Sequence, residues 1–364
     1  MGSSLLAAAM LLPLVATVQA EVQPEQGLVA FKYLNYRDSQ PGRDRIQVTT
    51  PVLSVMAPVG KSWSFSATKV VDSISGASPA YHTEALKKMV DQRHGFDASV
   101  TRYDPHGTLT VGFNQSVESD YKSDGLFLAG TRSSDDKNTT WNAALNVSHD
   151  KIYPSNGIVT DETKEVVELS LGITQVLTHI DIVQAILAYS RGSGYFSDPY
   201  KVFDNRPRER NHSTLLLRWN HHWEPIEATL RLSYRYYTDS YGIKAHTVAA
   251  EHVQPLGSGW QVIPSLRLYT QTAARFYVDR DPDAAPFVTN PPEGAIYFSE
   301  DQRLSSYGAH AVGLKLVKQL DRQWTLDFKA ERYEQQNGWS LSGGSPYLEP
   351  FSATSYQLGV SRSF

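Results

Sequence analysis

The sequence contains no cysteine and carries little net charge. With 0 cysteines in 364 residues, the chain has no disulfide, no thiol nucleophile, no thiolate metal ligand and no lipid-modified cysteine anchor. The formal net charge is only −4, whereas nucleic-acid-binding domains are usually strongly basic. Disulfide-stapled domains, thiol enzymes and zinc ribbons are therefore excluded, and no nucleic-acid partner is expected.

Long hydrophobic runs are also missing after residue 20. No stretch of about 18 apolar residues follows, and the mean hydropathy of the whole chain is −0.37. Membrane-spanning helices are thereby excluded from the rest of the chain. Only a closed β-barrel remains as a way for this sequence to cross a bilayer.

The one apolar run lies at the start of the chain, in residues 5–18. It is followed by Val18-Gln19-Ala20 and the polar Glu21, which is typical of a signal-peptidase site. The first four residues lack the usual Lys or Arg, and an N-terminal anchor is the alternative, although about 14 apolar residues are short for a span. We expect residues 1–20 to be a cleaved signal peptide and 21–364 to form one domain.

Apolar and polar residues alternate with a period of two over segments of about 10 to 14 residues, which lets one strand face lipid and water at once. In the segment 139–148, Trp141 and Leu145 share one face, and Asn142 and Asn146 share the other. The same alternation recurs in the segments 167–174, 226–236, 324–331 and 356–364.

Turn signals separate these segments and fall into two classes. Seven are short, at 58–61, 104–107, 134–138, 177–180, 223–225, 255–259 and 319–322. Eight are longer and polar, at 37–43, 73–92, 118–125, 150–164, 191–211, 237–242, 273–303 and 334–352. The pattern predicts an all-β fold, a transmembrane antiparallel up-and-down barrel of about 16 strands with short periplasmic turns and long outer loops.

Aromatic residues gather near the expected strand ends, for example Trp219, Trp223, Tyr236 and Tyr237, as interfacial girdles would require. The last segment alternates and ends on phenylalanine, which resembles the sorting signal of outer-membrane barrels; its residues are Tyr356, Leu358, Val360 and Phe364. We therefore expect a Gram-negative outer membrane, with its lipid, its lipopolysaccharide and the barrel-assembly machinery as partners.

Several separated motifs are similar to those of the DUF3570 family of uncharacterised bacterial proteins. They lie at 71–79, 118–123, 137–140, 233–242, 269–277 and 301–305, and so cover nearly the whole mature chain. The resemblance implies an outer-membrane barrel, and it implies no activity and no catalytic residues.

Alternation places a set of cations on the expected inner face of four consecutive strands. This predicted basic wall consists of Arg218, Arg231, Arg235, Lys244, His246 and Arg267. Predicted lumenal acids are Glu168, Asp327 and Glu331. Opposed charges of this kind select ions in pores, and the alternative is that they pair with one another and brace a closed lumen.

A Gly- and Ser-containing segment opens the loop expected at 73–92. Its residues Asp72, Ser73, Ser75, Gly76, Ser78 and Pro79 permit tight folding into the lumen as a plug. A lid held at the rim is the alternative.

Three functions remain open from the sequence. The first is a porin-like channel for small solutes or anions. The second is a non-conducting shell that sheathes or docks an exported partner, such as a lipoprotein or an electron-transfer protein. The third is a lipid hydrolase, for which Asn211-His212-Ser213 supplies residue types that diverge along a strand. No catalytic residue, metal or cofactor is expected. The acidic stretch 279–301 lacks the spacing of an EF-hand and is interpreted as a solvated loop, with Ca²⁺ binding through its oxygen ligands as the alternative.

Overall fold

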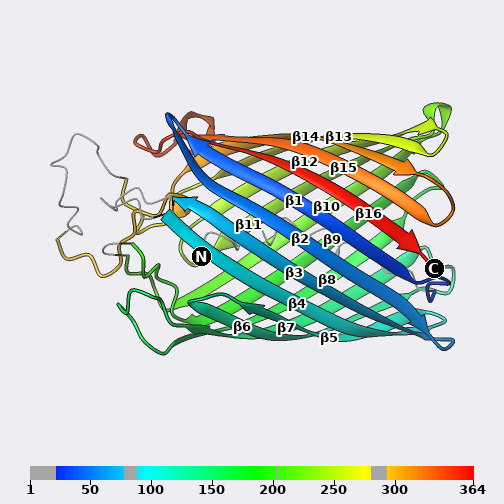
Figure 1. The fold of residues 1–364 in the computed structure, drawn as a ribbon, viewed down its shortest axis with the longest axis horizontal. Helices are drawn as coiled ribbons and strands as arrows, with labels where there is room; N and C mark the ends of the chain where they lie inside the picture. The colour runs from blue at the N-terminus through cyan, green and yellow to red at the C-terminus, as the bar shows by residue number, and fades with distance from the viewer. Residues whose placement is uncertain (1–21, 78–87, 202–203, 280–292) are drawn as a thin grey trace.

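The structure is a computed structural model that describes residues 22–77, 88–201, 204–279 and 293–364. Sixteen antiparallel strands follow one another around a closed barrel, and β16 pairs with β1 (Figure 1). No described helix is long and apolar enough to span a membrane. The predicted fold class and strand number are therefore confirmed.

The strands are β1 (Leu28–Gln40), β2 (Arg43–Val59), β3 (Trp63–Ala77), β4 (Lys88–Asp104), β5 (Gly107–Val117), β6 (Tyr121–Ser133), β7 (Thr139–Ile152), β8 (Glu162–Val176), β9 (Asp181–Gly194), β10 (Glu209–Trp223), β11 (Ala228–Asp239), β12 (Lys244–Gly257), β13 (Trp260–Gln271), β14 (Tyr307–Gln319), β15 (Trp324–Gln336) and β16 (Phe351–Ser363). Three short 3-10 helices complete the described elements: η1 (Glu224–Ile226), η2 (Gln302–Leu304) and η3 (Asn337–Trp339).

The register of the strands separates an apolar outer wall from a polar inner wall. Successive side chains alternate between the faces, and directly paired residues share a face. On β8, Leu169 and Leu171 are exposed. Leu169 pairs with Leu145 of β7, and Leu171 pairs with Leu187 of β9. Glu168 lies on the opposite, inner face of β8. The alternation read from the sequence thus corresponds to a lipid-facing wall and a lumenal wall.

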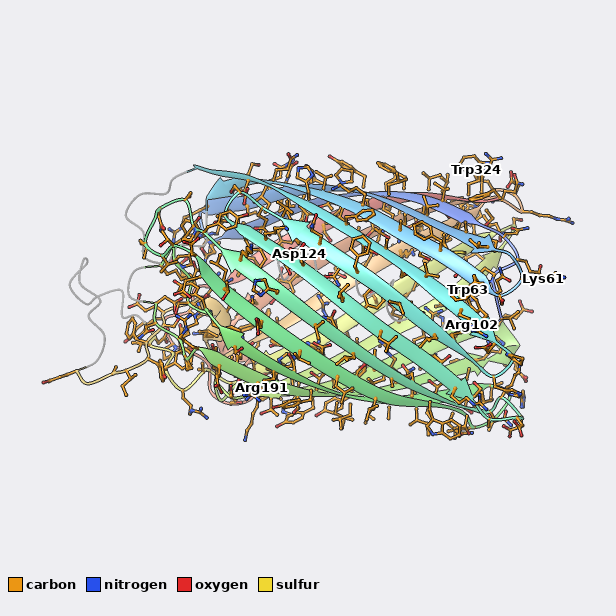
Figure 2. The ribbon with its side chains drawn as sticks, turned by 90° about the horizontal axis from the view of Figure 1, so that it is seen from below. Lys61, Trp63, Arg102, Asp124, Arg191 and Trp324 are labelled. Atoms are coloured by element: carbon orange, nitrogen blue, oxygen red, sulfur yellow. The ribbon has the colours of Figure 1, made fainter. Side chains whose placement is uncertain are left out.

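Tryptophans mark one end of the outer wall. Six of the 7 tryptophans lie on strands at the end with short turns, namely Trp63, Trp141, Trp219, Trp223, Trp260 and Trp324. Figure 2 shows Trp63 and Trp324 at this end, and Asp124 and Arg191 toward the opposite end. Arg102 lies 5.9 Å above the Trp63 ring, and Arg362 lies 5.4 Å from the centre of Trp324. An amphipathic belt of this kind fits a membrane–water boundary.

The seven predicted short turns all connect strands, but the predicted long connections are partly wrong. Pro41 and Gly42 alone join β1 to β2, and residues 118–120 and 240–243 join β5 to β6 and β11 to β12. The strands extend into polar sequence because paired strands can continue beyond the bilayer, where their side chains meet water. Polarity therefore marks the membrane boundary there and not the end of a strand.

The predicted plug or lid segment needs the same correction. Asp72, Ser73, Ser75 and Gly76 belong to β3, where they pair with residues 89–93 of β4. Asp72 faces inward, accepts a hydrogen bond of 2.5 Å from Thr50 and forms an ion pair with Arg93. Ser73 and Ser75 alternate with it and face outward. These residues are wall and not plug, and Ser78 and Pro79 lie outside the described residues.

Substitutions on adjacent residues of β8 test the two walls. We expect Leu171→Arg to lower the free energy of unfolding by about 2–4 kcal/mol, because it places a charge in lipid. Ser170→Arg is the matched control, since it adds the same side chain to the lumenal wall, and its cost is expected to be much smaller. Urea unfolding of the barrel in lipid vesicles measures both, and equal losses would contradict the assigned faces.

Candidate functional site

Four arginines of the predicted basic wall lie on the inner face. Arg218 of β10 pairs in register with Ser233 of β11, and Arg231 and Arg235 share that face of β11. Arg267 of β13 lies on the same face two strands further on. Arg218 donates a hydrogen bond of 2.9 Å to Gln184, and Arg231 lies 3.6 Å from Glu251. These four residues are called the arginine wall below.

Lys244 and His246 do not belong to the arginine wall, and their prediction is wrong. His246 pairs with Tyr236 and shares the outer face with the exposed Val248. Its ring lies 5.1 Å from the ring of Tyr236, and its Nδ1 lies 2.8 Å from the hydroxyl of Tyr234. Because side chains alternate along a strand, Lys244 lies on this outer face too. The charge of these two side chains predicts an inward position. The apolar residues of β12 that share their face lie toward lipid, however, and so both side chains face outward.

Sequence reasoning missed a further inward arginine on the strands of this wall. Arg210 of β10 lies above the arginine wall toward the long-loop end and bonds Asp239 at 2.8 Å. Its guanidinium lies 4.7 Å from the ring centre of Tyr241. The connection expected at 191–211 includes this residue. In the structure β10 already begins at Glu209, so Arg210 belongs to the wall.

The three predicted lumenal acids lie in two different places. Glu331 of β15 stands 3.6 Å from Arg267 and 2.9 Å from Lys329, and Asp327 lies 3.8 Å from Lys315. These two acids are thus interleaved with cations beside the arginine wall. Glu168 faces the lumen from β8, away from them, and pairs in register with Asn146 and Ser190.

At the long-loop end, connections from three strand pairs pack into one cluster. Its buried apolar residues come from the β11–β12 and β13–β14 connections and are Tyr241, Ile243, Ala274 and Leu304. Phe196 and the inward Tyr237 pack against them. Gln271, on the inner face of β13, donates hydrogen bonds to the carbonyl oxygens of Arg303 at 3.1 Å and Ser305 at 2.6 Å. The loops are therefore fastened to the inner side of the wall.

A carboxylate lies at the centre of this loop cluster. Asp301 is fully buried and lies 2.7 Å from Arg206 and 3.9 Å from Lys201, and it also forms an ion pair with Arg303. Arg206 in turn bonds Asp204 at 2.5 Å. Burial alone would raise the pKa of Asp301, but the positive charges of Arg303, Lys201 and Arg206 outweigh it and hold that pKa well below its usual range.

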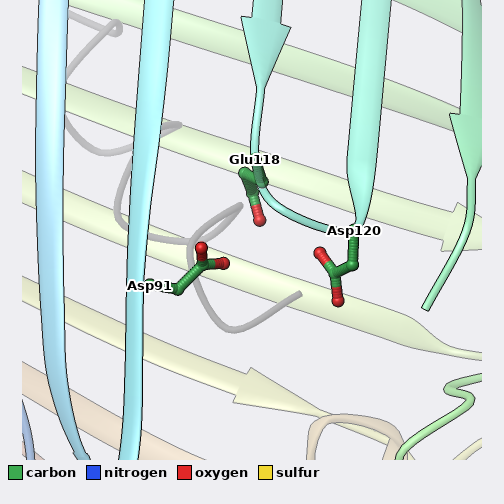
Figure 3. A group of neighbouring side chains, drawn as sticks. All are labelled: Asp91, Glu118 and Asp120. Atoms are coloured by element: carbon green, nitrogen blue, oxygen red, sulfur yellow. The ribbon is translucent and has the colours of Figure 1, made fainter. Parts of the chain in front are cut away.

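A separate group of carboxylates lies at the rim between β4 and β6. Oxygen atoms of Asp91, Glu118 and Asp120 lie within 4.8 Å of one another (Figure 3). Asp120 also accepts a hydrogen bond from the Tyr200 hydroxyl. Three carboxylates offer few of the six to eight oxygen ligands that Ca²⁺ prefers, so the group by itself defines no metal site. The acidic stretch 279–301 lies partly outside the described residues, and its interpretation as a solvated loop is wrong at its end, where Glu300 and Asp301 are buried.

The three consecutive residues considered as catalytic candidates, Asn211, His212 and Ser213, do not share one face of β10. His212 faces inward beside Ser190, whereas Asn211 and Ser213 face outward beside Arg191 and Tyr189. The residues of the predicted C-terminal sorting signal lie on the outer face of β16, and Tyr356, Leu358 and Phe364 are exposed there.

Closed topology, an apolar outer wall and a polar lumen define the class, an outer-membrane β-barrel. Among solved structures, a bacterial polysaccharide outer membrane secretin matches with a TM-score of 0.55 at 9% identity, over 93% of this chain and 98% of that chain. OccD3 (OpdP) of Pseudomonas aeruginosa matches with a TM-score of 0.46 at 11% identity, over 97% and 96%. At 9% identity, the similarity to the secretin shows the fold alone.

The family profile described as "Protein of unknown function (DUF3570)" matches residues 2–87, 85–161 and 156–349. The chain belongs to this family, as its motifs indicated. No curated protein matches the sequence.

Removing the charge of Asp301 tests the loop cluster. Asp301→Asn leaves the buried Arg206 and the half-buried Arg303 short of a counter-charge, so we expect opening of the loops to become easier by about 3–5 kcal/mol. Hydrogen exchange read by mass spectrometry should show faster exchange in residues 195–201 and 299–306, with the strands unchanged. Glu293→Gln, in the same connection but exposed, is the control, and equal exchange in both variants would contradict the assignment.

The lowered pKa also gives this protection a pH dependence. The charged form of Asp301 stabilises the closed loops, so its contribution is complete above the ordinary pKa of 3.8 and is lost as the pH falls through the lowered pKa. We expect protection in the wild-type loops to persist on acidification to that ordinary value. Earlier loss, with the strands still protected, would show that another group controls the closed loops.

Proposed function

We propose that this protein is an outer-membrane channel for the passive passage of small solutes, with a preference for anions. The observation that carries the proposal is an excess of positive charge on one side of the lumen. The inner positions of β10 to β13 hold five arginines against two carboxylates, Asp239 and Glu251. Within the described residues, neither Arg218 nor Arg235 has a carboxylate within 4.0 Å.

The opposite side of the lumen has the opposite sign. Asp97 faces inward from β4, eight strands around the ring from β12, and Glu168 faces inward from β8, on the arc between them. In the part of the chain that the structure describes, no cation lies within 4.0 Å of either carboxylate. A solute in the lumen would thus experience a field directed across its path, which selects and orients charged molecules in narrow pores.

A non-conducting shell for an exported partner is the second candidate function. The loop cluster around Asp301 favours it, because loops fastened to the inner wall can narrow the mouth of the barrel. An enzymatic role is not proposed, since alternation separates His212 from Ser213 on opposite faces of β10. Export through a cleaved signal peptide in a Gram-negative cell remains a prediction, because residues 1–21 lie outside the described chain.

Charge reversal on the arginine wall tests the channel. In planar bilayers under a salt gradient, we expect stable steps and a reversal potential that reports anion preference for the wild type. The double variant Arg231→Glu with Arg235→Glu should lower the anion-to-cation permeability ratio at least about threefold, because it reverses the local potential.

Arg191→Glu, on the outer face of β9, is the control and should leave selectivity unchanged. A conducting double variant with wild-type selectivity would contradict the role of the arginine wall. A folded, heat-modifiable wild type that never conducts would favour the shell.

A further inference from the structure

Tyrosines form a repeated arrangement on the inner wall just above the arginine wall. Four of them occupy equivalent places on β1, β11, β13 and β15, and each donates its hydroxyl to the side chain two residues further along its own strand. The distances are 3.1 Å for Tyr36 to Asp38, 2.9 Å for Tyr237 to Asp239, 2.5 Å for Tyr269 to Gln271 and 2.9 Å for Tyr333 to Gln335. These four tyrosines are called the tyrosine belt below.

These hydrogen bonds fix the orientation of the rings. Two residues of a strand span about 6.7 Å, which is close to the reach of a tyrosine side chain. A ring whose hydroxyl meets the next inward side chain therefore lies along the wall and does not cross the lumen. All four tyrosines are half-buried, whereas their acceptors are buried.

Small residues on the strands between the tyrosines extend the same surface. Tyr237 pairs with Ala245, which pairs with Gln271. The same relay runs from Tyr269 through Ala309 to Gln335, and from Tyr333 through Ala353 to Asp38. The three alanines are only 3%, 5% and 4% exposed. Further rings adjoin the belt: the ring centre of Tyr307 lies 5.6 Å from that of Tyr269, and that of Phe351 lies 6.0 Å from that of Tyr333. The belt is therefore part of a broad aromatic surface on the inner wall.

Charged groups border the belt on the side of the short turns. Arg235, Arg267 and Glu331 stand two residues before Tyr237, Tyr269 and Tyr333 on the same strands and the same face. The side chain of Arg267 is 43% exposed, and its guanidinium group lies 3.6 Å from Glu331. Arg235 is exposed and, among the described residues, has no carboxylate within 4.0 Å.

We propose that the tyrosine belt and the guanidinium groups of Arg235 and Arg267 form a binding subsite for small carboxylates that carry a ring. The ring stacks on the flat tyrosine faces, as apolar surfaces and aromatic faces do in ligand sites with few polar groups. The carboxylate bonds the guanidinium groups, whose planar geometry matches it. The inference deepens the proposed channel function by naming the class of solute that pauses in the lumen.

Ligand-observed NMR on the full barrel in detergent micelles tests the subsite without requiring conduction. The probes are galacturonate and 4-hydroxybenzoate, which share a ring and a carboxylate, with galactose and acetate each lacking one of the two. We expect saturable binding of at least one ring carboxylate, and at least about tenfold weaker binding of galactose and acetate, as for loss of one charge-assisted contact.

Variants assign the binding to these side chains. Tyr269→Ala, and separately Arg235→Gln with Arg267→Gln, should each weaken binding at least about tenfold. Tyr269→Phe keeps the ring and covers the case in which the alanine variant fails to fold; loss of its anchored orientation should weaken binding several-fold. Tyr189→Ala, on the outer face of β9, is the matched control and should bind as the wild type does.

Each outcome decides between alternatives. Binding of 4-hydroxybenzoate alone assigns the subsite to aromatic acids, and binding of galacturonate alone assigns it to sugar acids. Acetate binding as tightly as either ring carboxylate, no binding of any probe, or wild-type binding by the belt variants would overturn the proposal. Binding by a barrel that never conducts would support the subsite and contradict the channel function. Conduction without binding of a ring carboxylate would support the channel function and contradict the subsite.

Discussion

A strand cannot leave its backbone N–H and C=O groups unpaired in a bilayer, and this constraint determines the rest of the structure. The barrel meets it by pairing β1 with β16 over twelve positions, from Leu28 with Ser363 to Ser39 with Ser352. Reciprocal backbone bonds of 2.8 and 3.0 Å between Gly27 and Phe364 extend that seam. A Cβ at residue 27 would lie only 2.4 Å from the Phe364 ring, so glycine permits this close approach. Closure leaves no free sheet edge.

Closure also decides what the side chains can do. Each strand presents every second residue to lipid, so the chemistry of the protein is confined to the remaining half of the wall and to the loops. On that inner wall, charge is distributed by side: arginines gather on β10 to β13, while Asp97 and Glu168 face them from other strands. Above the arginines lies the tyrosine belt, and above the belt lie the loops around Asp301. The three features follow one another along the lumen and give one path from the short-turn end to the loops.

The sequence was sufficient to predict the class, the strand number and the two walls, because alternation and turns are local signals repeated many times. It was insufficient where the phase of a single strand had to be chosen. His246 was assigned inward because it is polar, but it shares its parity with the apolar Val248 and so faces outward. The Gly and Ser residues after Asp72 predict a loop there, whereas pairing with β4 extends β3 to Ala77. Both errors arise because strand pairing in three dimensions overrides local composition.

Non-local features of the candidate site were beyond local reasoning. Asp301 and Arg206 are far apart in the sequence, and only the folded loops bring them to 2.7 Å. Tyr237 was grouped with its aromatic neighbours as an interfacial residue, yet its inward parity makes it part of the belt. The signal was present as a tyrosine two residues before a glutamine or aspartate on alternate strands, but the equivalence of those strands depends on the register of the closed barrel.

The central claim is that the lumen is water-filled and carries opposite charge on opposite walls, and the absence of cysteine permits a direct test. Ser233→Cys places one thiol beside Arg218, and Asn114→Cys places one beside Asp97 on the opposite wall. The measurement is the rate at which each variant, folded in lipid vesicles, reacts with an anionic and with a cationic methanethiosulfonate. We predict faster reaction with the anionic reagent in the first variant and with the cationic reagent in the second. The same charge preference in both variants, or no reaction in either, would contradict the account.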